Sequence, residues 1–175
     1  MNACRLLVLS GLLAASLAHA QKPQISVSAR QKLEGDTEQN STKYTNTKDK
    51  DRTCELTIQL RNGDPKEQKV KLTWYFVGDP LVGGFDDFVY DKGELEMTLP
   101  ARFATNLVQK SKPIESKVAT GRKKVTKSGA KHAGFIVMVS QETNLLAVAT
   151  APTSLDKTAR NAEAMAKLLL VPTPP

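Results

Sequence analysis

Residues 52–63, RTCELTIQLRNG, place Cys54, Leu56, Ile58 and Leu60 at every second position. The residues between them are polar or charged, so the apolar side chains fall on one face of an extended chain. This segment therefore predicts a β-strand with one face in the core and the other in water.

The same alternation recurs along the chain and predicts further strands. Apolar residues share one face over 25–29, 70–76 and 95–99, and the turn residues Asn62, Gly63 and Pro65 predict that strands 54–60 and 70–76 form an antiparallel pair. The tripeptide DKG at 91–93 predicts a turn before the strand that ends at Pro100.

Two segments near the C-terminus predict a covered sheet and a helix. Residues 134–140, GFIVMVS, are apolar on both faces, as in a central strand covered on two sides. Residues 145–151 carry mostly alanine on one face. A single helix over 153–171 is predicted to begin at a capping box of Thr153 and Asp156 and to end at Val171-Pro172.

The predicted helix has a narrow apolar face, and two partners suit it. We expect it to pack on the alanine side of strand 145–151 and over Ile136 and Met138; the alternative is a coiled-coil seam to another chain. The face consists of Leu155, Ala159, Ala162, Ala166 and Leu169.

These elements predict one mainly β domain. Short strands separated by turns and followed by a helix favour an immunoglobulin-like antiparallel β-sandwich over 21–152, with helix 153–171 packed on one sheet. Residues 36–52 contain Tyr44 as their only large apolar side chain and are predicted to form a flexible polar loop.

The first twenty residues have the pattern of a secretory signal peptide. One basic residue, Arg5, precedes an apolar run that ends at Ala18-His19-Ala20, so we expect the mature chain to start at Gln21 in the periplasm or outside the cell. Because this run is short and no later one reaches about 18 residues, no membrane span is expected.

Cys54 is the only cysteine that would remain after processing, because Cys4 lies in the signal peptide. No intrachain disulfide could then form. Its phase with aliphatic neighbours predicts a buried, inert thiol; the alternatives are an intermolecular disulfide or a reactive thiol, both of which need exposure.

No group of residues predicts catalysis or a cofactor. His132 is the only histidine expected in the mature chain and is interpreted as a lone surface residue, since one histidine and one buried cysteine complete neither a catalytic triad nor a zinc site. The acidic segment 79–96 is the best alternative, with Asp86, Asp87 and Asp91 as weak candidates for calcium binding or acid-base work.

The most polarised stretch of the sequence runs from residue 110 to residue 131 and has eight basic residues against Glu115. It predicts either a solvated strand edge protected by lysines or a face for an anionic glycan or envelope protein. Export and the lack of interleaved aromatic residues argue against nucleic acid. The candidate residues are Lys110, Lys112, Lys117, Arg122, Lys123, Lys124, Lys127 and Lys131.

Three motifs carry a resemblance to a known group of proteins. KVKLTWYFVG (69–78), GELEMTLP (93–100) and the segment HAGFIVMVSQETNLLAVATAPTSLDKTA (132–159) resemble small exported immunoglobulin-like proteins of mucin-associated gut bacteria. The resemblance implies an archaeal-pilin-like fold and a role beside type IV pili. The chain lacks the long apolar N-terminal helix that a pilin keeps after cleavage.

Two functions are therefore expected. The first is a non-enzymatic secreted or envelope module that binds an anionic or pilus partner through the basic residues of 110–131. The second is an exported hydrolase or calcium-dependent protein that uses the acidic segment 79–96. The partner and the oligomeric state are open at this stage.

Overall fold

The computed structural model describes residues 24–173, so the predicted signal peptide and its cleavage site lie outside the described residues. Residues 24–173 form nine strands and two short helices. The elements are β1 (Ile25–Glu34), β2 (Thr37–Ser41), β3 (Thr45–Asn62), β4 (Gln68–Pro80), β5 (Phe88–Leu99), β6 (Ala104–Lys110), β7 (Ile114–Gly121), β8 (Val125–Gln141), β9 (Asn144–Ala151), α1 (Leu155–Arg160) and α2 (Ala162–Leu170).

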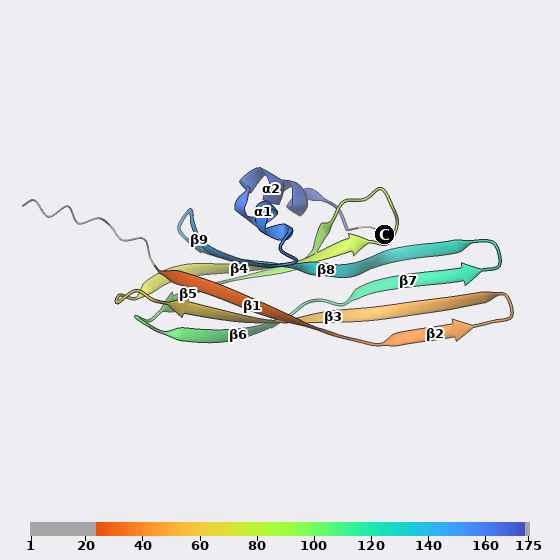
Figure 1. The fold of residues 1–175 in the computed structure, drawn as a ribbon, viewed down its shortest axis with the longest axis horizontal. Helices are drawn as coiled ribbons and strands as arrows, with labels where there is room; N and C mark the ends of the chain where they lie inside the picture. The colour runs from red at the N-terminus through yellow and green to blue at the C-terminus, as the bar shows by residue number, and fades with distance from the viewer. Residues whose placement is uncertain (1–23, 174–175) are drawn as a thin grey trace, which may run out of the picture.

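Two antiparallel sheets face each other across the main core. One consists of β1, the second half of β3, and β6; the other runs β9-β8-β4-β5. The inward side chains of β3, β4 and β8 fill the space between them, including Cys54, Trp74 and Val137. The predicted mainly β, antiparallel sandwich with a helical C-terminal segment is confirmed (Figure 1).

The predicted antiparallel pairing of strands 54–60 and 70–76 is wrong. The first belongs to β3, which pairs with β1 and β6, and the second to β4, which pairs with β5 and β8 in the opposite sheet. The segment between them crosses from one sheet to the other. Asn62 anchors this crossing: its buried amide donates to the carbonyls of Lys66, Leu99 and Pro100 at 2.9, 3.2 and 3.0 Å.

The turn predicted at residues 91–93 is also absent, because these residues lie inside β5. Gly93 pairs with Trp74 on β4, and a Cβ atom at Gly93 would lie 2.3 Å from the indole ring. The glycine therefore makes room for a core tryptophan rather than a turn.

The single helix predicted over 153–171 is broken at Asn161, which has an extended backbone. Its side chain accepts a hydrogen bond from the Ala164 backbone N–H at 3.0 Å and so caps α2, whereas the predicted capping box makes no side-chain cap. The break changes the phase of the apolar face. Leu155 and Ala159 are buried as predicted, but in α2 the buried residues are Met165 and Leu168.

The helices cover the outer face of the β9-β8-β4-β5 sheet. They contact Ile136 and Met138 of β8 as predicted, together with Val77 and Val148. The predicted contact with the alanine face of β9 is wrong, because Ala147, Ala149 and Ala151 face the main core on the side of β1. In the described part of the chain, neither helix is long and apolar enough to cross a membrane.

Four strands extend beyond the sandwich as a single-layered sheet, which we call the arm (residues 37–52 and 114–129). β2, the first half of β3, β7 and the first part of β8 pair in this order. Figure 1 shows them running away from the helices to two hairpin tips. The predicted loop at 36–52 is thus a strand pair, since backbone pairing with β7 orders residues that bury little apolar surface.

Candidate functional site: the basic arm

The positive charge of the described chain is concentrated in the arm. The arm has nine basic and four acidic residues, a net charge of +5, whereas the rest of residues 24–173 has fourteen of each. The sandwich and its helices are thus neutral overall. An anionic partner would therefore be drawn to one end of the molecule.

Strand register sorts the charges of the arm onto two faces. In KDKDR (48–52), neighbouring side chains point to opposite sides of the sheet, and directly paired residues share a side. Lys48 pairs with Val118, which also pairs with Lys127 of β8. The basic face therefore contains Lys48, Lys50, Arg52 and Lys127, and no acidic residue of the arm.

The acidic face is the opposite side of the same sheet. Asp49 pairs with Glu38 on one side and Lys117 on the other, and Asp51 pairs with Glu115. Lys117 reaches Asp49 at 3.4 Å, and Asp49 Oδ1 is buried without a hydrogen-bond partner. Like charges placed directly opposite each other destabilise a strand pair, so this sorting has a cost in stability.

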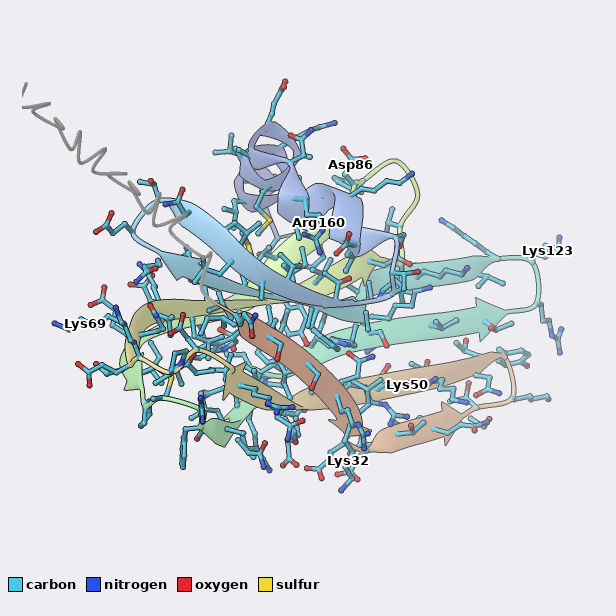
Figure 2. The ribbon with its side chains drawn as sticks, turned by 60° about the vertical axis from the view of Figure 1, so that its left-hand side comes forward. Lys32, Lys50, Lys69, Asp86, Lys123 and Arg160 are labelled. Carbon is cyan, nitrogen blue, oxygen red and sulfur yellow. The ribbon has the colours of Figure 1, made fainter. Side chains whose placement is uncertain are left out.

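The two hairpin tips meet at an aromatic ring. The Arg122 guanidinium lies 4.7 Å from the centre of the Tyr44 ring, and the Lys43 ammonium lies 5.6 Å from it. The cation–π contact of Arg122 ties the β7–β8 tip to the β2–β3 tip, whereas Lys43 belongs to the same tip as Tyr44. Figure 2 shows Lys123 at the end of the arm, far from Lys69 at the opposite end of the sandwich.

The structure separates the eight basic residues predicted from segment 110–131 into two sets. The first set is held in ion pairs: Lys110 with Glu34 and Glu55, Lys112 with Asp91, Lys117 with Asp49, and Lys131 with Asp79. The second set consists of Arg122, Lys123, Lys124 and Lys127, which lie exposed on the arm and form no ion pair within residues 24–173.

Of the acidic residues predicted as weak calcium or catalytic candidates, Asp86 and Asp87 share the loop before β5, and Asp91 lies on the strand itself. Asp91 lies on β5, where it accepts the Lys112 backbone N–H at 2.8 Å. Asp86 lies in the loop before β5, 3.7 Å from Lys167 on α2. Burial, with Asp79 and Asp86 nearby, raises the pKa of Asp87. Within residues 24–173, no three His, Cys, Asp or Glu side chains form a group that could hold a metal ion.

A groove of about 710 Å³ opens where the basic face meets the mouth of the sandwich. Lys48, Lys50 and Arg52 line it from β3, and Lys131 and His132 line it from β8. His132 is half-buried and hydrogen-bonded on both ring nitrogens, so it differs from the lone surface histidine that the sequence predicts.

Sequence reasoning missed the β3 part of this site. Lys48, Lys50 and Arg52 lie in the segment predicted as a loop. In a loop, alternating charges do not fall on two separate faces. The signal was present as strict Lys-Asp-Lys-Asp-Arg alternation, which sorts charge only if the segment is a strand. Likewise, nothing in the sequence placed Tyr44 beside Arg122, because that contact joins two separate hairpins.

Comparisons with known proteins do not assign this chain to a family. No family model matches it, and no curated protein matches it. One solved structure, Northeast Structural Genomics Consortium target SoR45, covers 67% of this chain and 89% of its own, with 15% identity and a TM-score of 0.23.

Proposed function

We propose that this protein is a non-enzymatic binding or structural module of the cell envelope or exterior, and that the arm holds an anionic partner. The observation that carries the proposal is the sorting of charge by strand register. Lys48, Lys50 and Arg52 form a row on one face without an acidic neighbour on it. Alternate residues of a strand lie about 6.7 Å apart, so this row suits a partner with repeated negative charges.

The predicted export of the chain supports the proposal of an anionic partner. The signal-peptide pattern of residues 1–20 would deliver the chain to a compartment where acidic glycans and pilus proteins are exposed. The resemblance to pilus-associated proteins makes a pilus component a candidate partner. The alternative of an exported hydrolase finds less support, because four of the six acidic side chains of 79–96 are held by separate ion pairs: Glu94 with Lys71, Asp91 with Lys112, Asp79 with Lys131 and Asp86 with Lys167.

Charge neutralisation on the basic face tests the proposal. The triple variant Lys48→Gln, Lys50→Gln, Arg52→Gln should elute from immobilised heparin at clearly lower salt than the unmodified protein. Each basic residue near an anionic surface contributes about 1 kcal/mol, so the three together should weaken binding roughly 100-fold.

The matched control removes the same charge from the sandwich, outside the arm. Lys66, Lys69 and Lys92 are exposed residues of the sandwich, and their triple change to Gln should leave heparin retention nearly unchanged. If both triple variants lose heparin retention equally, net charge alone decides retention. That result would contradict the proposal that the arm binds the partner.

A further inference from the structure

The groove between the arm and the sandwich has the features of a site for one anionic group. Cationic side chains approach it from two strands, namely Lys48, Lys50 and Arg52 on β3 and Lys131 on β8. No acidic side chain of residues 24–173 lines it. Lys50 and Arg52 are half-buried, so their charges are less screened than those at the hairpin tips.

His132 is held at this groove by two hydrogen bonds. Its Nε2 lies 2.8 Å from Oε1 of Gln31 on β1, and its Nδ1 lies 2.9 Å from the hydroxyl of Tyr90 on β5. The Gln31 oxygen can only accept, so Nε2 carries the proton of the neutral ring. Nδ1 then accepts from the Tyr90 hydroxyl.

The same network can also hold the imidazolium. A proton on Nδ1 would be donated to the Tyr90 oxygen, and the Tyr90 hydroxyl would turn to Ser111 Oγ at 3.3 Å. Ser111 Oγ is fixed by the Cys54 backbone N–H at 2.9 Å and by its own bond to the Lys112 carbonyl at 2.7 Å. Protonation therefore leaves no buried polar group without a partner.

The protein groups around the groove disfavour a proton on Nδ1 of His132. Burial lowers the pKa of His132 from its usual value. Gln31 on β1 and Tyr90 on β5 face the ring as uncharged partners, and the charged side chains of the groove are cations. Two acidic side chains of the adjoining strands are held by lysines: Asp79 of β4 lies 2.9 Å from Lys131, and Asp91 of β5 lies 3.7 Å from Lys112. On β3, Asp49 and Asp51 lie on the opposite face of the arm.

We propose that this groove seats a sulfate or carboxylate group of an acidic polysaccharide, and that binding strengthens as His132 takes up a proton. The inference rests on the proposed function of the arm. Within the groove, the row from Arg52 to Lys48 runs toward the hairpin tips, where Lys43 and Arg122 lie. The lining contains no aromatic side chain other than His132, so stacked bases find no platform there.

Nuclear magnetic resonance of His132 tests this inference directly. The purified protein would carry His19→Asn, which leaves His132 as its only histidine. The probe is a heparin hexasaccharide, compared with a galacturonate hexamer, inorganic sulfate and a DNA hexamer. We expect the hexasaccharide to raise the pKa of His132 by about one unit, and its affinity to be up to tenfold higher at pH 5 than at pH 8, because the two quantities are linked.

Two variants locate the effect. His132→Gln should bind the hexasaccharide with an affinity that hardly changes between pH 5 and pH 8. The double variant Lys123→Gln, Lys124→Gln at the tip should weaken binding by the same factor at both pH values. If His132→Gln lowers the melting temperature, the titration of the intact imidazole decides the matter alone.

The outcomes distinguish this inference from the proposed function. Binding of the hexasaccharide without a change in the pKa of His132 would overturn the groove site and leave the arm as a binding surface. If neither oligosaccharide binds the folded protein at any pH, both the groove site and the proposed function of the arm are overturned. An equal pKa shift with inorganic sulfate or the DNA hexamer, at the same molar concentration, would overturn the assignment to a polysaccharide.

Discussion

Gly93 and Trp74 form a directly opposed pair in which only glycine fits. The indole ring of Trp74 lies across the Gly93 backbone, at the position that a methyl group would occupy. Trp74 is 9% exposed and belongs to the main core. The pair shows that a glycine within a β-strand can be required by packing rather than by backbone conformation.

Gly93→Ala should therefore destabilise the sandwich. The added methyl group must displace the indole ring, and overpacking of this kind costs about 1–3 kcal/mol. Urea unfolding followed by Trp74 fluorescence measures the loss. Gly83→Ala is the matched control, because no atom lies within 4 Å of the methyl position there; an equal effect of both changes would show that Trp74 does not fill the space over Gly93.

Cys54 illustrates what the sequence predicts well at this scale. Its phase with Leu56 and Ile58 predicts burial, and the thiol is free and fully buried. Burial raises the pKa of Cys54 to about 11, so the reactive thiolate is scarce at neutral pH.

The prediction of a lone surface histidine at position 132 is wrong. The hydrogen-bond partners of His132, Gln31 and Tyr90, are 101 and 42 residues away in sequence, so the local sequence does not reveal them.

At the scale of elements, Gly129 marks the point where β8 leaves the arm and joins the sandwich. Up to Gly129 the strand pairs with β7, and from Ala130 it pairs with β4. The φ angle of Gly129 is 76°, and a Cβ atom there would lie 2.3 Å from the Glu115 carbonyl oxygen. Only glycine meets both conditions without strain.

Gly129→Ala should loosen the arm while the sandwich stays folded. A left-handed backbone costs an alanine about 1–2 kcal/mol, and the clash with Glu115 adds to it. Hydrogen exchange should show faster exchange for the β7 amides that pair with β8, and unchanged protection for the β4 amides. Uniform loss of protection in both strands would contradict a junction confined to the arm.

The pairing of strands was harder to predict than their existence. Alternation located the strands around 54–60, 70–76 and 134–140, which have one or two buried faces. It also located the strand around 95–99, where Leu99 is buried and Met97 is half-buried. Alternation does not reveal that strands 54–60 and 70–76 belong to opposite sheets and face each other across the core. The turn residues between them are compatible both with a hairpin and with a connection from one sheet to the other. The arm escaped prediction because a single-layered sheet exposed on both sides leaves no hydrophobic period.

At the scale of the whole molecule, charge and packing are divided between two ends. The sandwich and helices contain the buried apolar clusters and are electrically balanced. The arm has little apolar core and carries all of the net charge of residues 24–173. Of the eight basic residues that the sequence predicts to bind a partner, four serve in ion pairs. The sequence count of charge could not show this division, which depends on strand register.

A charge-conserving swap tests the central claim most directly. The variant Lys48→Asp, Asp49→Lys, Lys50→Asp, Asp51→Lys keeps the composition and net charge of the chain and moves two lysines to the acidic face. If sorted charge on the arm holds an anionic partner, this variant should lose most of its retention on heparin while its circular dichroism spectrum stays that of the unmodified protein. Retention equal to that of the unmodified protein, with the fold intact, would contradict the account.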